Sequence, residues 1–114
     1  MRLTSVMWVA AYVRRCHSSG AYAVVRRRGA AEAGAIFVIL DSLDGNRTLY
    51  APAPQSELDE RAPGIDRVFR EVLRTDDVLA MEAKLGREMD FDPDLWIVEN
   101  EDREGRHFLD LVEA

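Results

Sequence analysis

Apolar residues near the N-terminus recur at the spacing of an amphipathic helix. They run from Val6 to Val13 at intervals of three and four, and Trp8 and Tyr12 form a second apolar stripe beside the first. Thr4 or Ser5 can cap the helix, because either hydroxyl accepts a hydrogen bond from the first turn. A helix with so much apolar circumference is either deeply buried or half covered by a partner.

Shorter apolar runs then predict β-strands at residues 21–28, 35–43 and 47–51. The middle run is apolar on both faces, which is typical of a central strand. Asp44-Gly45-Asn46, between the second and third runs, is a strong hairpin signal. We expect these strands to form an antiparallel meander.

The segment 65–74 fits two structures. Its apolar residues match helical spacing, whereas its β-branched content and the preceding strands slightly favour a fourth strand. A second helix is predicted after it, capped by Thr75 or Asp76 and ending at Asp90. Gly86 inside this helix suggests a close approach to the sheet.

The most distinctive stretch, Phe91 to Leu111, predicts a C-terminal hairpin. Leu95–Val98 is a compact apolar block that Pro93 separates from the preceding helix. Asp102-Arg103-Glu104-Gly105 suits a type I turn with a bulge, and residues 106–112 would return as the partner strand. The predicted fold class is α+β, an antiparallel sheet of about five strands with an N-terminal helix and a second helix before a C-terminal hairpin.

Length and composition predict a single domain, residues 1–114. The chain is 47% hydrophobic and 32% charged, which is typical of a globular protein. Cys16 is the single cysteine, so no intramolecular disulfide can form, as is usual in a reducing compartment. The longest apolar run, Val6 to Val13, is too short to span a bilayer. We therefore expect a cytoplasmic protein without a membrane partner.

The net charge of −6 is unevenly distributed. Seven arginines and three acids give residues 1–50 a charge of +4, whereas residues 51–114 carry −10. Because non-specific nucleic-acid binding depends on neutralising phosphates, the overall balance argues against it. The asymmetry leaves room for a local basic patch or for head-to-tail self-association.

Two arginine clusters make an anion or nucleotide a candidate ligand. Arg14 and Arg15 end the first helix, and Arg26, Arg27 and Arg28 end the first strand. An arginine fork recognises carboxylates and phosphates through two parallel hydrogen bonds. Packing of the helix on the strand would separate the clusters, so they would not all meet at one site. Arginines on an edge strand can also simply prevent edge-to-edge pairing.

Acidic residues crowd the C-terminal stretch. Asp92, Asp94, Glu99 and Glu101 could offer oxygen ligands to Mg²⁺ or Ca²⁺. Alternatively, Asp92 and Asp94 stabilise a turn around Pro93, while Glu99 and Glu101 share a solvated strand face. Because no complete calcium-loop or zinc-ligand spacing is present, we predict no metal site and no cofactor, and retain Asp92, Asp94 and Glu99 as candidate binding residues.

Gln55 and Trp96 complete the candidate binding set. Gln55 lies in the proline-rich stretch 51–64, a loop long enough to carry function. Catalytic motifs are lacking: Cys16 and His17 are adjacent on a helix and point about 100° apart, so they do not form a nucleophile–base pair. No catalytic residue is predicted.

Several short motifs together resemble one family. They are Trp8–Tyr12, Gly34–Val38, Leu49–Gln55, Phe91–Glu99 and Gly105–Arg106. Over essentially the whole chain, the sequence resembles a family of small alphaproteobacterial proteins known as a domain of unknown function. The resemblance implies a self-contained cytoplasmic domain and supplies no activity, cofactor or catalytic residue.

Three functional hypotheses follow. The leading one is a non-enzymatic protein-interaction module that self-associates or binds another protein, since large apolar surfaces tend to be interfaces. The second is a divalent-metal-dependent enzyme that uses the carboxylates of residues 92–101. The third is an anion-binding or nucleotide-binding protein that uses the arginine clusters.

Overall fold

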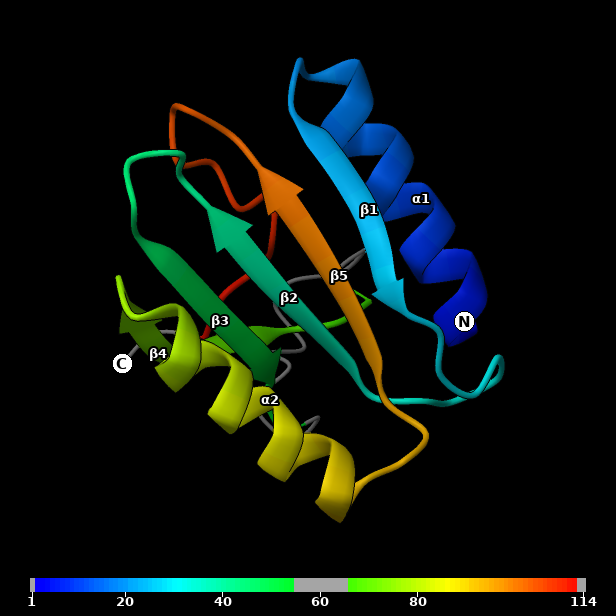
Figure 1. The fold of residues 1–114 in the computed structure, drawn as a ribbon. Helices are drawn as coiled ribbons and strands as arrows, with labels where there is room; N and C mark the ends of the chain where they lie inside the picture. The colour runs from blue at the N-terminus through cyan, green and yellow to red at the C-terminus, as the bar shows by residue number, and fades with distance from the viewer. Residues whose placement is uncertain (1, 55–65, 113–114) are drawn as a thin grey trace.

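A five-stranded sheet with one helix on each face forms the body of the protein (Figure 1). The computed structural model describes residues 2–54 and 66–112. In chain order the elements are α1 (Ser5–Ser18), β1 (Tyr22–Arg27), β2 (Ile36–Asp41), β3 (Arg47–Pro52), β4 (Phe69–Thr75), α2 (Val78–Phe91) and β5 (Trp96–Glu101). The α+β class is confirmed. The segment 65–74 fitted both a helix and a strand, and the structure has strand β4 there. Within the described ranges, no helix is both long and apolar enough to cross a membrane.

The strand order is β1-β5-β2-β3-β4. Strands β2, β3 and β4 are antiparallel neighbours, whereas β5 lies between β1 and β2, antiparallel to the first and parallel to the second. The predicted meander is therefore wrong at its first pairing, because β1 does not contact β2 as a neighbour. Helix α2 provides the crossover that returns the chain to the centre of the sheet.

The loop between β1 and β2 packs closely against the residues that lead into β5. The amide of Ala30 donates to the carbonyl oxygen of Asp94 at 2.9 Å, and the amide of Trp96 donates to that of Ala35 at 2.7 Å. A Cβ atom on Gly29 would overlap the carbonyl of Asp94 and lie 2.6 Å from that of Leu95. Only glycine allows the two segments to pass this closely.

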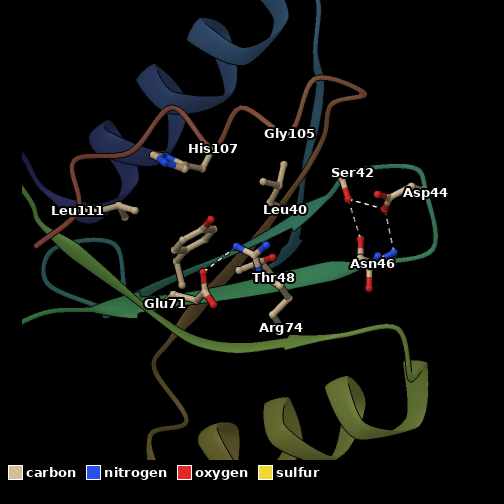
Figure 2. A pocket seen from close by; sticks show the side chains of 11 residues that line it. Leu40, Ser42, Asp44, Asn46, Thr48, Glu71, Arg74, Gly105, His107 and Leu111 are labelled. Atoms are coloured by element: carbon tan, nitrogen blue, oxygen red, sulfur yellow. Dashed lines mark hydrogen bonds and ion pairs between the residues drawn. The ribbon is translucent and has the colours of Figure 1, made fainter. Parts of the chain in front are cut away.

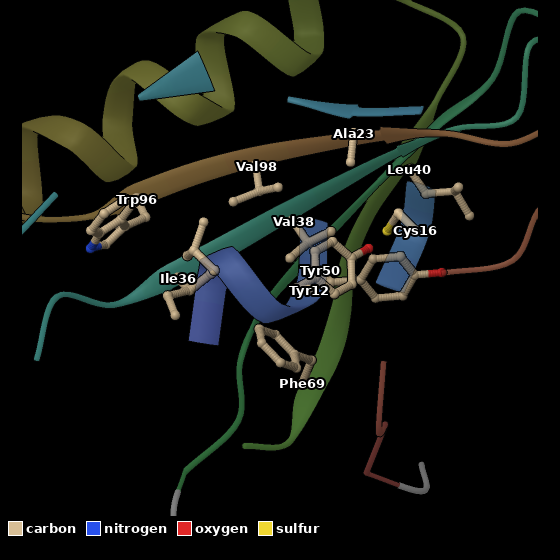
Figure 3. Packing of buried hydrophobic residues seen from close by; sticks show 11 residues of the cluster. Tyr12, Cys16, Ala23, Ile36, Val38, Leu40, Tyr50, Phe69, Trp96 and Val98 are labelled. Carbon is tan, nitrogen blue, oxygen red and sulfur yellow. The ribbon is translucent and has the colours of Figure 1, made fainter. Parts of the chain in front are cut away.

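Two apolar cores lie on opposite faces of the sheet. Figure 3 shows the core under α1, which contains Val9, Tyr12, Cys16, Ala23, Ile36, Val38, Leu40, Tyr50, Phe69, Trp96 and Val98. The core under α2 contains Phe37, Ile39, Leu49, Ala51, Met81, Leu85, Leu95 and Ile97. Successive residues of β2 alternate between the cores, so this strand is buried on both faces as its sequence predicts.

The apolar circumference of α1 is covered by the chain's own C-terminal segment. Thr4 caps the helix as predicted, its hydroxyl accepting from the amide of Met7 at 3.3 Å. The rings of Trp8 and Tyr12 stack with centroids 5.1 Å apart. The Tyr12 hydroxyl donates to the carbonyl of His107 at 2.7 Å. The second stripe of this helix is thus packed within the same chain.

Residues 106–112 do not form the predicted returning strand. Gly105 adopts the positive φ expected of the turn, +71°. The chain then crosses the α1 side of the sheet and makes one isolated bridge, between Leu111 and Phe69. A hairpin partner for β5 is excluded because β1 and β2 already occupy both of its edges.

Helix α2 begins one residue later than predicted. Asp77 is the cap and accepts from the amides of Leu79 and Ala80, whereas the Thr75 hydroxyl accepts from the Asp77 amide. The predicted close approach at Gly86 is wrong, because nothing lies within 4 Å of the position of a Cβ atom there.

Candidate functional site

Helix α2 leaves part of its own side of the sheet uncovered. Figure 1 shows that the helix lies away from β1. The core beneath the helix is centred on β2 and β3, and apolar side chains are exposed on β1. Tyr22 is 57% exposed and Val24 is 37% exposed. The Tyr22 ring also stacks on the ring of His17 of α1, with centroids 5.9 Å apart. Apolar side chains that stay exposed together on a folded protein can mark an interface.

Strand register places three carboxylates beside these apolar residues. Tyr22 lies opposite Glu101, and Val24 lies opposite Glu99. Glu101 lies opposite Asp41 on the other neighbouring strand. Because alternate residues of a strand share a face, all five side chains belong to one surface, which we call the open sheet face.

The carboxylates of Asp41, Glu99 and Glu101 converge. One oxygen from each lies within 4.8 Å of the others. At such separations two carboxylates repel by about 1–4 kcal/mol, depending on the local dielectric. The cluster therefore attracts a positive group.

Two arginines partly neutralise the cluster. Arg47 lies 3.3 Å from Asp41, and Arg26 lies 3.3 Å from Glu99. Arg26 also contacts Glu82 of α2 at 3.1 Å, which ties the helix to the rim of the open sheet face. Within the described ranges, no ion pair joins Glu101, and the cluster keeps a net negative charge.

The predicted arginine clusters contact separate partners. The Arg27 guanidinium donates to the carbonyls of Leu95 and Pro93 at 2.7 and 2.8 Å, which fixes the chain before β5. The Arg28 guanidinium lies 5.0 Å from the centroid of the Trp96 ring.

Arg14 and Arg15 are exposed on α1, and Arg15 lies 5.8 Å from the centroid of the Phe108 ring. Each clustered arginine with a described contact has its own partner: Phe108 for Arg15, Glu82 for Arg26, Leu95 for Arg27 and Trp96 for Arg28. The contacts described here do not bring the two clusters to one site. Of the arginines in the two predicted clusters, Arg26 has a described contact with the open sheet face, through Glu99.

The remaining candidates occupy different environments. Asp92 accepts from the amide of Asp94 at 3.0 Å, the local turn bond that the sequence suggests. Trp96 is fully buried and donates its indole N–H to the carbonyl of Ala30 at 2.8 Å. Gln55 lies outside the described residues. The sequence suggested Asp92, Asp94, Glu99 and Glu101 as possible ligands of one metal ion. In the structure, Glu99 and Glu101 converge, whereas Asp92 and Asp94 precede the first residue of β5.

Comparison with known proteins identifies the family. A family model described as a protein of unknown function, DUF1491, matches residues 3–110. The chain belongs to the DUF1491 family.

Solved structures of similar proteins agree with this assignment. A crystal structure of a DUF1491 family protein from Caulobacter crescentus CB15 is 36% identical, with a TM-score of 0.79 and 100% of both chains covered. The solution structure of protein Atu0922 from A. tumefaciens is 43% identical, with a TM-score of 0.82, and covers 100% of this chain and 98% of that one. Among curated proteins, none matches the chain.

Sequence reasoning missed Asp41, Tyr22 and Val24 as site residues. Asp41 is the last residue of an apolar strand. An acidic residue is common there because the end of a strand often reaches solvent. The alternation of Tyr22 and Val24 along β1 is visible in the sequence. What the pattern cannot reveal is that α2 stops short of β1 in this DUF1491 protein.

Proposed function

We propose that this DUF1491 protein is a non-enzymatic interaction domain that binds a basic segment of a partner protein at the open sheet face. The observation that carries the proposal is the juxtaposition of exposed Tyr22 and Val24 with the three converging carboxylates. A lysine or arginine of the partner would lie among the carboxylates and relieve their repulsion, and charge-assisted hydrogen bonds of this kind are the strong ones.

The apolar part of the surface supports the same proposal. Tyr22 and Val24 offer an aromatic ring and a branched side chain on adjacent positions of one strand face. Aromatic side chains at the centre of an interface commonly supply much of its binding energy. The favoured partner segment therefore places an apolar side chain close to its basic residue.

Charge also favours the encounter. The chain carries a net charge of −6, and eighteen of its acids lie in residues 51–114. Opposite charges speed association, and salt weakens this effect because it screens exposed charges. Binding at the open sheet face should therefore weaken as the salt concentration rises.

The edge of β1 argues for side-chain docking over strand addition. His17 Nε2 lies 3.0 Å from the carbonyl oxygen of Ala23, and the register with β5 shifts between Val25 and Arg27. Bulges and charged residues on edge strands disfavour pairing with another chain. These features also oppose self-association through this edge.

Peptide display tests the proposal directly, because the displayed peptides themselves serve as the partner segment. Random peptides selected on the wild-type protein should be enriched in lysine or arginine beside aromatic or aliphatic residues. Their binding should be lost in an E99Q/E101Q variant. The E104Q variant is the matched control, because Glu104 is 73% exposed and lies outside the open sheet face. Peptides without basic residues, or equal binding to the double variant, would refute the proposal.

A divalent cation is the competing occupant of the carboxylate cluster. Mg²⁺, Ca²⁺ and Mn²⁺ all prefer oxygen ligands. Thermal melting with each ion distinguishes the two occupants, because a ligand that binds only the folded state raises the melting temperature. A rise that E101Q abolishes, in the absence of peptide binding, would assign the cluster to a metal instead.

A further inference from the structure

A groove lies on the opposite side of the sheet from the open sheet face. It has a volume of about 410 Å³ and lies between the β2–β3 hairpin, β4 and the C-terminal segment (Figure 2). Its floor includes Leu40, Thr48 and Tyr50 from the sheet. The volume falls within the range of small-molecule sites.

Two side chains with hydroxyl groups lie at the floor of the groove. Thr48 is only 6% exposed and Tyr50 only 3% exposed, and both line the groove. Among the described residues, no hydrogen bond involves either side-chain hydroxyl, whereas the hydroxyl of Tyr12 donates to the carbonyl of His107. Both residues line the groove, where a bound polar molecule can form hydrogen bonds with their hydroxyls.

His107 adds a donor. Its Nδ1 accepts from the amide of Leu109 at 2.9 Å. Burial lowers the pKa of this imidazole, so the ring is neutral at neutral pH. A neutral ring with Nδ1 as the acceptor carries its proton on Nε2, which can then donate to a ligand.

The charges around the groove do not favour an anion. Arg74 is paired with Glu71 at 3.0 Å, so the β4 wall is neutral overall (Figure 2). On the hairpin wall, Asp44 accepts from the Ser42 hydroxyl at 2.6 Å and from the Asn46 amide at 3.0 Å, and it stays negative. A phosphate or carboxylate would meet a site with one excess negative charge.

We propose that the groove binds a small, uncharged, polyhydroxylated molecule of the saccharide or cyclic polyol class. Each ligand hydroxyl can both donate and accept, which matches the hydroxyls of Thr48 and Tyr50. The carboxylates of Glu71 and Asp44 accept from hydroxyls at the ligand's periphery. Leu40 and the Tyr50 ring provide an apolar surface for its C–H face.

Three sugars that differ mainly in charge test the proposal. Glucose, glucosamine and glucose 6-phosphate would be titrated separately into the isotope-labelled protein, and amide chemical shifts would be recorded. myo-Inositol, a cyclic polyol, would be titrated in the same way. We expect shifts at groove residues with glucose and glucosamine, and weaker or no shifts with glucose 6-phosphate. Glucose and myo-inositol both leaving the groove amides unshifted would overturn the proposal, as would tightest binding of the phosphorylated sugar.

Two conservative variants connect binding to the floor hydroxyls. Y50F and T48V each remove one hydroxyl and keep the side chain's shape. Each should weaken glucose binding by about fivefold to tenfold, the usual effect of one hydrogen bond between uncharged groups. Y22F is the matched control, since Tyr22 lies on the open sheet face. Unchanged binding in both floor variants, with unchanged melting temperatures, would show that the hydroxyls hold no ligand.

Discussion

At the scale of single residues, two glycines of this protein should respond oppositely to the same substitution. A Cβ atom on Gly29 would overlap backbone atoms of Asp94 and Leu95, whereas nothing lies within 4 Å of such an atom on Gly86. G29A should lower the unfolding free energy by about 3 kcal/mol, since backbone cannot move aside as a side chain can. G86A should raise it by about 1 kcal/mol, because alanine favours helix over glycine. Chemical denaturation measures both, and equal effects would contradict the close approach at Gly29.

His107 should make the protein sensitive to acid. Burial lowers its pKa, and nearby Asp110 only partly opposes this; the ring also contacts Tyr50, and Tyr12 binds its carbonyl. The unfolded chain binds the proton more readily, with a pKa of about 6.5. The stabilising effect of the neutral ring is therefore complete above that pH and is lost as the pH falls from there toward the folded-state pKa.

The variant H107N tests whether protonation of His107 causes the loss of folding stability in acid. An asparagine side chain can accept from the Leu109 amide in place of Nδ1 but cannot gain the proton. Denaturant unfolding at a series of pH values should therefore show a weaker loss of stability below about pH 6.5 in H107N. H17N, which changes the other histidine, should retain the full loss. A pH profile of H107N identical to that of wild type would exclude His107 as the source.

At the scale of elements, the β5–β2 pairing places like charges opposite each other. Asp41 and Glu101 are direct cross-strand neighbours, and Arg47 approaches only Asp41 of the two. Like charges in this position are destabilising. E101Q should therefore raise the unfolding free energy by about 0.5–1 kcal/mol, as measured by urea denaturation. E104Q should not. A fall in stability would mean that Glu101 makes a favourable interaction in the folded protein.

Local signals predicted the elements themselves. Thr4 caps α1 and Gly105 adopts its positive φ, because caps and turns depend on a few neighbouring residues. The returning strand was mispredicted because the alternation of residues 106–112 satisfies a strand pattern, although Phe108 takes a left-handed conformation, φ +59°, that breaks it. Strand pairing is not local, so the central position of β5 could not be predicted.

At the scale of the whole molecule, the candidate site was only partly visible in the sequence. Glu99 was identified because it is one of many clustered acids, but its partner Asp41 lies far away along the chain and joins it only through the β2–β5 pairing. The arginine run made an anion one candidate ligand. In the structure, the Arg27 guanidinium donates to the carbonyl of Leu95, and the Arg28 guanidinium lies over the Trp96 ring. Only the tertiary contacts distinguish an arginine that is free to bind a ligand from one that contacts the chain itself.

The position of β5 also governs how the protein is made. Of the described strands, β5 is the last to leave the ribosome, yet it is the strand that joins β1 to β2 in the sheet. In a nascent chain that lacks residues 96–101, no strand joins β1 to β2, and α1 contacts β2, β3 and β4 through side-chain packing alone. Strands β1 and β2 then each expose a bare edge, the kind of surface that chaperones shield and that aggregates capture. The sheet is completed only in a late step, in which β5 pairs with β1 and β2.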